Sequence, residues 1–378
     1  MRSDRLQRPI DLPSLSWVDK WIDTHSVHFI TPKTVSYERA AALTQETIEE
    51  WFTRIGAEAD PASVPSSLTF NMDETQVSAS ALRVKIIVPR DQKSGMRAVE
   101  NKQEDTHITL VLCISADGGH VRSTVILPLK EFPTNCDALK DDFCWSGQDK
   151  GWITADIFRS WVIQVFIPHV QEIRRSNNFP ETQRAILYLD SHSSRQDVQA
   201  LESLSSANID AITLIAHGSH GHQALDVHVN GVFKTRFRKY KPNVRMFSPE
   251  QRRPAILNAV KRALHEALYI DVIKESFERS GLYPFNMTAL LQSPYVTPAG
   301  SYLGFEVPKG KKRSRVSISG KVITSDEVKR SLLEASQKDK KKRPKKRQRR
   351  TNAANKLVID LRREGDDVSS EEWREGDD

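Results

Sequence analysis

The chain has 378 residues, a formal net charge of +7 and a hydrophobic fraction of 38%. This length allows two or three domains, or one large α/β domain with tails, and the low apolar fraction indicates that part of the chain does not pack into a core. No apolar run reaches the roughly 18 residues of a membrane span, and the first residues lack the apolar segment of a secretory signal. The three cysteines have no metal-ligand spacing and are expected to be free thiols.

Two helices are predicted near the N-terminus. Trp17, Trp21 and Ile22 lie on one face of a short amphipathic helix. Thr44 is a good N-cap for a longer helix, which we expect to end at Gly56.

Strands are predicted next. Apolar and polar residues alternate from Leu68 to Thr75, which is the period of a half-buried strand. Further strand-like runs occur at 84–88, 108–115 and 121–127. The turn at 117–119 contains Asp-Gly-Gly and is expected to join the last two runs as a hairpin. Residues 131–153 have no regular pattern.

The following segment alternates between helices and strands. Thr154 opens a helix that is expected to end before Pro168. Two short apolar runs, 185–189 and 209–215, flank a predicted helix, and a further helix is expected at 254–279. This order predicts an α/β fold in which helices flank a mixed sheet.

Charge is segregated near the C-terminus. A basic cluster at 338–350 precedes an acidic end. Residues 291–378 are therefore predicted to be a low-complexity tail, basic then acidic and mostly disordered. The cluster at 340–350 has the composition of a nuclear-import signal, so we expect a nuclear protein that contacts the import machinery.

Three aspartates mark the ends of predicted strands. Asp73 is expected to end the first strand, Asp190 stops the run 185–189, and Asp226 follows the last strand. Converging carboxylates repel one another unless a divalent cation is present, and Mg²⁺ prefers such oxygen ligands. Two ions about 4 Å apart can activate a water or a 3′-hydroxyl for phosphoryl displacement. The alternative is that these acids are solvated turn residues or helix caps.

Five motifs occur in a fixed order. They are FNMDET (70–75), GWIT (151–154), LYLDSHSS (187–194), LIAHGSHGHQALDV (214–227) and SGLYPFN (280–286). Together they resemble the DDE superfamily endonuclease domain of the pogo, Tigger and Jerky-type transposases, the group that includes centromere protein B. The resemblance implies an RNase H-like fold and a catalytic, metal-binding triad of Asp73, Asp190 and Asp226. It also implies Mg²⁺ or Mn²⁺ as cofactor, with two ions.

The resemblance suggests a domain division and partners. Residues 1–58 would be a remnant of a helix-turn-helix and a helical linker, 59–290 the DDE RNase H-like catalytic domain, and 291–378 the tail. DNA is the implied partner, and we also expect a homodimer.

Further residues are expected to support the triad. The candidates that would orient the loops or contact phosphate are His192, Ser193, His217 and His220. Glu74 points to the opposite face of the strand from Asp73 and is expected to assist the site rather than bind metal. A zinc site built from the histidines of 217–222 lacks partner ligands elsewhere in the sequence.

A basic run begins eight residues past Asp226. It consists of Lys234, Arg236, Arg238, Lys239 and Lys241. These side chains either contact nucleic-acid phosphates or form a solvated helix face.

The sequence departs from the family pattern around the third acid. The usual prolines before it are replaced by Ile215, Ala216 and Ala224, and Asn230 stands where phenylalanine is usual. We therefore expect this loop to be looser or reshaped. Two functions remain open: a Mg²⁺-dependent endonuclease that cleaves and transfers DNA strands, or a domesticated, catalytically inactive nuclear protein that binds nucleic acid or chromatin.

Overall fold

The computed structural model describes residues 14–25, 39, 41–78, 107–129, 131–149, 151–243, 246–296 and 317–342. The chain forms two compact units, 1–37 and 38–378. The described part of the first unit is helix α1 (Leu15–His25), on which the rings of Trp17, Trp21 and His25 stack in succession. The predicted amphipathic helix is therefore present, with both tryptophans exposed.

The second unit is built on a six-stranded mixed sheet. In chain order its strands are β1 (Thr69–Ser78), β2 (His107–Ser115), β3 (Thr124–Leu127), β4 (Cys144–Gly147), β5 (Ala185–Leu189) and β6 (Ile209–Thr213). Their order in space is β4-β3-β2-β1-β5-β6. Strand β1 is central because it pairs antiparallel with β2 and parallel with β5. All five residues of β5 are buried, as expected of a strand covered on both faces.

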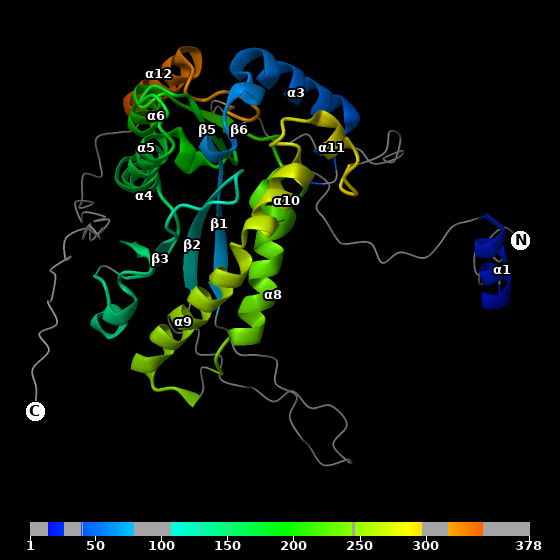
Figure 1. Cartoon of the computed structure of the whole chain (residues 1–378), viewed down its shortest axis with the longest axis horizontal. Helices are drawn as coiled ribbons and strands as arrows, with labels where there is room; N and C mark the ends of the chain where they lie inside the picture. Colours follow the sequence, from blue (N-terminus) through cyan, green and yellow to red (C-terminus); the bar gives the residue numbers. More distant parts are fainter. Residues whose placement is uncertain are drawn as a thin grey trace, which may run out of the picture. The chain divides into compact units, whose positions relative to one another are not determined.

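Helices cover both faces of this sheet, as the sequence predicted (Figure 1). One group contains α4 (Ala155–Trp161), α5 (Ile167–Ser176) and α6 (Val198–Ser206). The other contains α8 (Asn230–Tyr240), α9 (Pro249–Ala267) and α10 (Ile270–Ser280). Shorter helices are α7 (Ser219–His222) and α11 (Met287–Leu291). None of the helices in the described ranges is both long and apolar enough to cross a membrane.

Helix α3 (Gln45–Ala59) begins where the sequence predicted. Thr44 accepts a hydrogen bond from the backbone of Thr47, whose side chain caps in return. The helix continues three residues past Gly56, and Asp60 ends it in the left-handed conformation. The position of the C-cap was therefore predicted one turn too early.

Two strand predictions need correction, and a third falls outside the described residues. Asp73 lies in the middle of β1, opposite Leu112, because the buried positions Thr75 and Val77 carry the strand on to Ser78. Strand β4 falls in the segment that showed no pattern, since four residues are too few to reveal a period. The predicted strand at 84–88 lies outside the described residues. The hairpin of β2 and β3 is confirmed by their antiparallel pairing.

The helix that opens at Thr154 also differs from its prediction. It passes through a π-helical turn at Val162–Phe166 and continues as α5 to Ser176. Pro168 does not stop it, because proline is tolerated in the first turn of a new helical segment.

The segment 317–342 lies beyond the expected boundary at residue 290 and packs against the sheet. Its backbone pairs with the edge strand β6, where Thr213 N donates to Lys321 O and Ile323 N donates to Ala211 O at 2.9 and 2.8 Å. Helix α12 (Asp326–Lys342) follows and buries Val328. A possible helix at 325–337 was predicted, but the pairing with β6 was not, because a short apolar stretch lies between two strongly basic ones.

Candidate metal centre

The centre of the site is Asp73 on β1. It is partly buried, and burial raises the pKa of its carboxyl well above the usual value. The negative charges of Asp226, Glu74 and Asp190 raise this pKa further, in that order of importance. Four carboxylates therefore act on one another at this point of the sheet.

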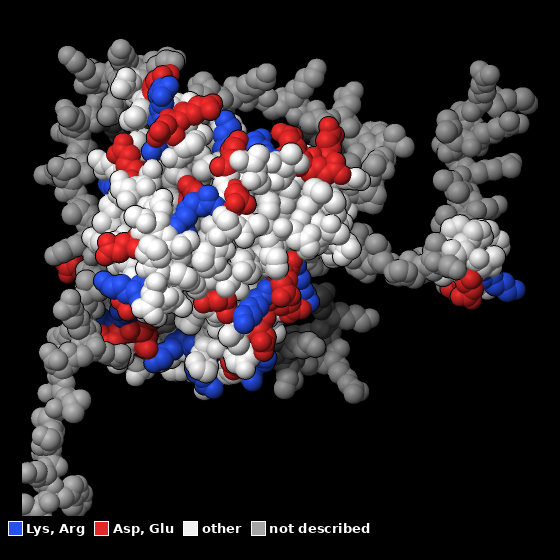
Figure 2. Space-filling model, turned by 45° about the horizontal axis from the view of Figure 1, so that its top comes forward, with Lys and Arg blue, Asp and Glu red and all other residues white. Residues whose placement is uncertain are grey.

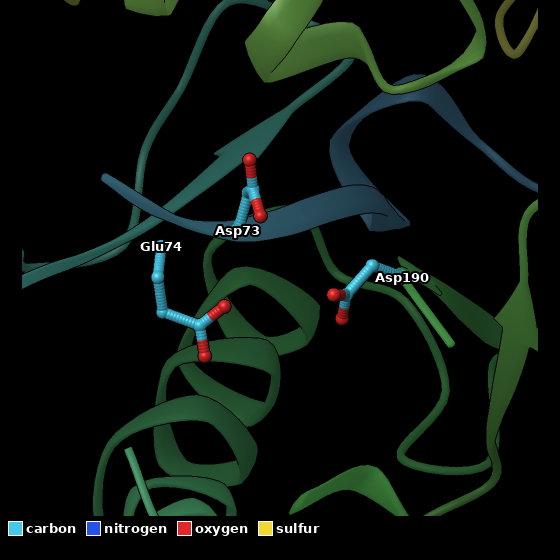
Figure 3. A group of neighbouring side chains, drawn as sticks. All are labelled: Asp73, Glu74 and Asp190. Atoms are coloured by element: carbon cyan, nitrogen blue, oxygen red, sulfur yellow. The ribbon is translucent and has the colours of Figure 1, made fainter. Parts of the chain in front are cut away.

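Asp190 reaches Asp73 because their strands are parallel neighbours. Asn71 of β1 pairs with Tyr188 of β5, and each aspartate lies two residues further along its chain. One carboxylate oxygen from each of Asp73, Glu74 and Asp190 lies within 4.8 Å of the other two. Asp73 and Glu74 leave β1 on opposite sides, and Asp190 extends from the end of β5 toward them (Figure 3).

Asp226 approaches from a helix rather than from the end of a strand. It is exposed and lies in the π-helical turn Leu225–Val229. Such turns are rare in proteins overall, but where they occur they are often at functional sites. The side-chain amide of Asn230 lies between it and the central acid. Its Nδ2 is 3.0 Å from Asp226 Oδ1 and 3.5 Å from Asp73 Oδ2. All three predicted acids thus lie around one centre.

The fully buried Asn71 ties together the three segments that carry these acids. Its Nδ2 donates to Tyr188 O at 3.1 Å, two residues before Asp190. Its Oδ1 accepts from Leu225 N at 3.0 Å, one residue before Asp226. Since Asn71 is itself two residues before Asp73, one side chain fixes the relative positions of all three segments.

A second buried amide holds the loop before Asp226. Gln223 is fully buried, and its Nε2 donates to Met72 O at 3.0 Å. The sequence had suggested a loosened loop, because the usual prolines are absent. The observed loop is anchored to β1 by hydrogen bonds from the side chain of Gln223 to Met72 and from Leu225 to the side chain of Asn71.

The Asp190 side of the site contains a buried cation. The fully buried guanidinium of Arg195 donates to both carboxylate oxygens of Glu74 at 2.6 Å and lies 3.3 Å from Asp190 Oδ1. It also packs 4.9 Å from the ring centre of Phe158. Glu74 is thus committed to an ion pair, which agrees with its expected supporting role.

The other predicted supporting residues are near the acids in the chain but do not contact them in the described structure. His192 is exposed, and its Nδ1 is 2.9 Å from Ser194 Oγ, while Ser193 is exposed. His217 is exposed with a positive φ of 59°. His220 is partly buried against Tyr295, and burial lowers the pKa of its imidazole, although the charge of Asp226 acts in the opposite direction. No direct contact joins these four residues to the acids in the described contacts.

His222 serves the core. It is fully buried, packs edge-on against Trp51 at 4.3 Å, and burial lowers the pKa of its imidazole to about 3. A neutral histidine beneath α3 is a packing residue, which argues against the zinc alternative.

The basic run lies on α8, except for Lys241, which is the C-cap of that helix. Phe233 and Phe237 turn inward, and the four basic residues from 234 to 239 are exposed. Arg236 is paired with Glu266 at 2.9 Å, and Lys239 lies 5.1 Å from the ring centre of Tyr240. On the face seen in Figure 2, basic and acidic side chains are intermixed across the surface.

The donor set fits a hard divalent cation. It consists of carboxylate oxygens and one amide, which are the ligands that Mg²⁺ and Mn²⁺ prefer, and it contains no thiolate. Asn230 Oδ1 is buried and has no hydrogen-bond partner. The amide nitrogen of Asn230 faces the carboxylates, while its oxygen has no partner. A cation bound here would reduce the repulsion between the carboxylates.

The strand order and the positions of the three aspartates define an RNase H-like fold with an acidic centre. Residues 105–277 match the model of the DDE superfamily endonuclease family. This range includes Asp190 and Asp226 but not Asp73, which is assigned to the site by its strand pairing. The match confirms the resemblance found in the sequence.

Relatives of known name are Jerky proteins. The chain is 28% identical to the human Jerky protein homolog over 148 residues, which are 39% of this chain and 25% of that protein. It is 30% identical to the mouse Jerky protein over 90 residues, or 24% of this chain and 16% of that one. The matched region thus spans a quarter or less of these relatives.

Solved structures of the Mos1 transposase are also similar. The mariner Mos1 paired end complex with Mg has a TM-score of 0.42 at 14% identity, covering 71% of this chain and 70% of that one. The Mos1 catalytic domain with Raltegravir and Mn has a TM-score of 0.38 at 12% identity, covering 66% and 96%.

Proposed function

We propose that this protein is a DDE-type endonuclease that cleaves DNA and transfers DNA strands with Mg²⁺ or Mn²⁺. Asp73, Asp190 and Asp226 hold the metal, with two ions in the active state. The observation that carries this proposal is the convergence of three carboxylates from separate elements on one point of β1. Repulsion among these carboxylates lowers the stability of the fold, and a bound cation would remove that cost. Such a cluster is therefore a candidate functional site, and its chemistry suits cation binding.

Bound ions would activate a water or a 3′-hydroxyl and stabilise the leaving oxygen of the phosphodiester. The chain itself supplies the positioning. Asn71 and Gln223 keep the loop of Asp226 against β1. Asp73 would hold a cation as its ionised carboxylate, the form that its raised pKa disfavours without metal.

Nucleic-acid binding is assigned to the exposed face of α8. Lys234 and Arg238 are exposed one turn apart on the helix that begins beside the acidic centre. Their positive charge suits DNA phosphates, with an affinity that falls as salt rises. Homodimerisation, a nuclear location and recognition of the basic cluster at 340–350 by the import machinery belong to the same proposal.

The test is nicking of supercoiled plasmid with Mg²⁺ or Mn²⁺. We expect metal-dependent nicking by the wild type and its loss in Asp190→Asn. Asp149→Asn is the matched control, because Asp149 is exposed and follows β4 at the opposite edge of the sheet. If the wild type and Asp190→Asn are equally inert at every metal concentration, the enzymatic proposal fails. Retained DNA binding would then support the alternative of a catalytically inactive nuclear nucleic-acid or chromatin-binding protein.

A further inference from the structure

We propose that Asn230 is a fourth ligand of the metal centre, and that its amide responds to the charge in the site. Without metal, Nδ2 donates to Asp73 and Asp226. With metal, the amide offers Oδ1 to the cation. This inference rests on the proposed function, because it requires a divalent cation between the carboxylates.

The position of Asn230 follows from helical geometry. It lies four residues after Asp226, so the two side chains share one helix face. Asn230 is only 3% exposed, and its side chain points toward the acids at 3.0 and 3.5 Å rather than into solvent. Burying a polar side chain costs free energy unless it finds a hydrogen-bond partner. For the amide nitrogen of Asn230, the two carboxylates are those partners.

The amide has one unsatisfied end. Asn230 Oδ1 is buried without a hydrogen-bond partner. A carboxamide has two donors on nitrogen and an acceptor oxygen, and these ends have nearly the same shape. Rotation about the last side-chain torsion therefore exchanges donor for acceptor without moving the helix. The donor end suits a pair of bare carboxylates, and the oxygen end suits a cation held between them.

The residue type at this position departs from the family pattern that the chain otherwise resembles. The family pattern found in the sequence has phenylalanine where Asn230 stands, and a phenyl ring can neither donate to carboxylates nor ligate a hard cation. Asn230 is thus an addition to the three acids that the resemblance implies.

The proposal is tested with Mn²⁺ titration calorimetry and with thermal unfolding in EDTA. The variants are Asn230→Leu, which removes both polar ends at similar size, and Asn230→Asp, which keeps an oxygen ligand but loses the donor. Asn258→Leu is the control, because Asn258 is an exposed helical asparagine that bonds only its own helix backbone in the described contacts.

We expect Asn230→Leu to weaken Mn²⁺ binding by at least about tenfold, the lower end of the losses caused by removing groups around a metal site. Asn230→Asp should unfold at a lower temperature than the wild type in EDTA, because a further negative charge joins the acids. The same variant should bind Mn²⁺ at least as tightly as the wild type. A purely structural role for Asn230 would weaken both properties of Asn230→Asp together.

The outcomes separate this inference from the proposed function. If the wild type binds Mn²⁺ through Asp190 but Asn230→Leu binds it equally well, Asn230 is not a ligand and the endonuclease proposal is untouched. If the wild type binds no Mn²⁺, both proposals fail. Should Asn230→Leu not fold, as judged by circular dichroism, Asn230→Asp decides: tight Mn²⁺ binding with lower stability in EDTA supports the proposal, and any other pattern overturns it.

Discussion

The two sides of Asp73 are stabilised in different ways. On the Asp190 side, the buried guanidinium of Arg195 provides a permanent positive charge and binds Glu74 through two hydrogen bonds. On the Asp226 side, the only group found between the carboxylates in the described structure is the neutral amide of Asn230. The charge on the Asp190 side is thus balanced by a cation of the chain itself, whereas in the described contacts a neutral group lies between Asp73 and Asp226.

This asymmetry has a physical consequence for the protein without metal. Arginine stays charged at any ordinary pH, so the Glu74 side holds its structure whether or not a metal is present. Burial raises the pKa of Asp73, and the negative charge of Asp226 raises it further, so ionisation of this carboxyl costs free energy when no cation is bound. Substitutions on the two sides should therefore respond differently to metal.

The largest effect is expected from Arg195→Leu. Removing the guanidinium leaves the Glu74 and Asp190 carboxylates without their partner, and breaking a buried ion pair costs about 3–5 kcal/mol of unfolding free energy. Urea denaturation measures this loss. Arg175→Leu is the control, because Arg175 and its partner Glu172 are 67% and 62% exposed and their pair should contribute less than about 1 kcal/mol. Similar losses in the two variants would show that the Arg195 cluster is not a stabilising element.

Metal binding should stabilise the protein by reducing the repulsion on the Asp226 side of Asp73. Mn²⁺ at a hundred times its dissociation constant should raise the unfolding free energy by about 2.7 kcal/mol, since only the folded chain has the site. Differential scanning fluorimetry with and without EDTA reports the change. In Asp226→Asn the gain should shrink at the same Mn²⁺ concentration. An undiminished gain in this variant would mean that the ion binds elsewhere.

Asn71→Leu tests the link between the two sides. The substitution leaves the Leu225 N–H and the Tyr188 carbonyl without their buried partner, which should cost about 1–3 kcal/mol. Mn²⁺ affinity should also fall, because the loop of Asp226 is no longer held against β1. Chemical denaturation and calorimetry measure the two effects. Loss of stability with unchanged Mn²⁺ affinity would show that Asn71 serves the core alone.

A smaller effect is expected from pH on Asp73→Asn in EDTA. Because the folded state raises the pKa of Asp73, it binds the proton more tightly than the unfolded chain does, and the wild type loses stability as pH rises above about 3.9. The asparagine variant has no such loss. Its stability relative to the wild type should therefore grow as pH rises through the folded pKa and then level off.

Each one-unit rise in pKa corresponds to about 1.4 kcal/mol of this difference. Saturating Mn²⁺ should reverse the order of the two proteins at neutral pH, because the cation binds the ionised carboxylate of the wild type. If the stability difference between Asp73→Asn and the wild type is the same at every pH, the folded state does not shift the pKa of Asp73. Thermal unfolding at a series of pH values provides the measurement.

The sequence predicted the acids better than the groups that hold them. Asp73, Asp190 and Asp226 stand out because carboxylates beside apolar strands are unusual, and family motifs surround them. Asn71 lies within the motif FNMDET and Asn230 departs from the family pattern, yet neither fact revealed what these side chains contact, and Arg195 gave no signal at all. Asn71 bonds Tyr188 and Leu225, which lie far away in the chain, so these contacts exist only once β5 and the turn Leu225–Val229 pack beside β1.

The same limitation explains the error at the C-terminal side. Periodicity found β1, β5 and β6, but the pairing of residues 321–323 with β6 has too few residues for a pattern to appear. The composition of the whole segment 291–378 is dominated by its charged residues, so this short apolar stretch was assigned to the tail with them.

The contact of this segment with β6 determines how the protein can be shortened. Thr213 donates from its backbone and its side chain to Lys321 O, and Trp51 Nε1 donates to the Thr213 carbonyl. A version of the chain that ends at residue 296 would match the boundaries suggested by the family motifs, yet it would leave the outer edge of β6 bare. Unpaired edges recruit strands from other molecules, so such a version is expected to aggregate through β6 beyond any dimer that the longer chain forms.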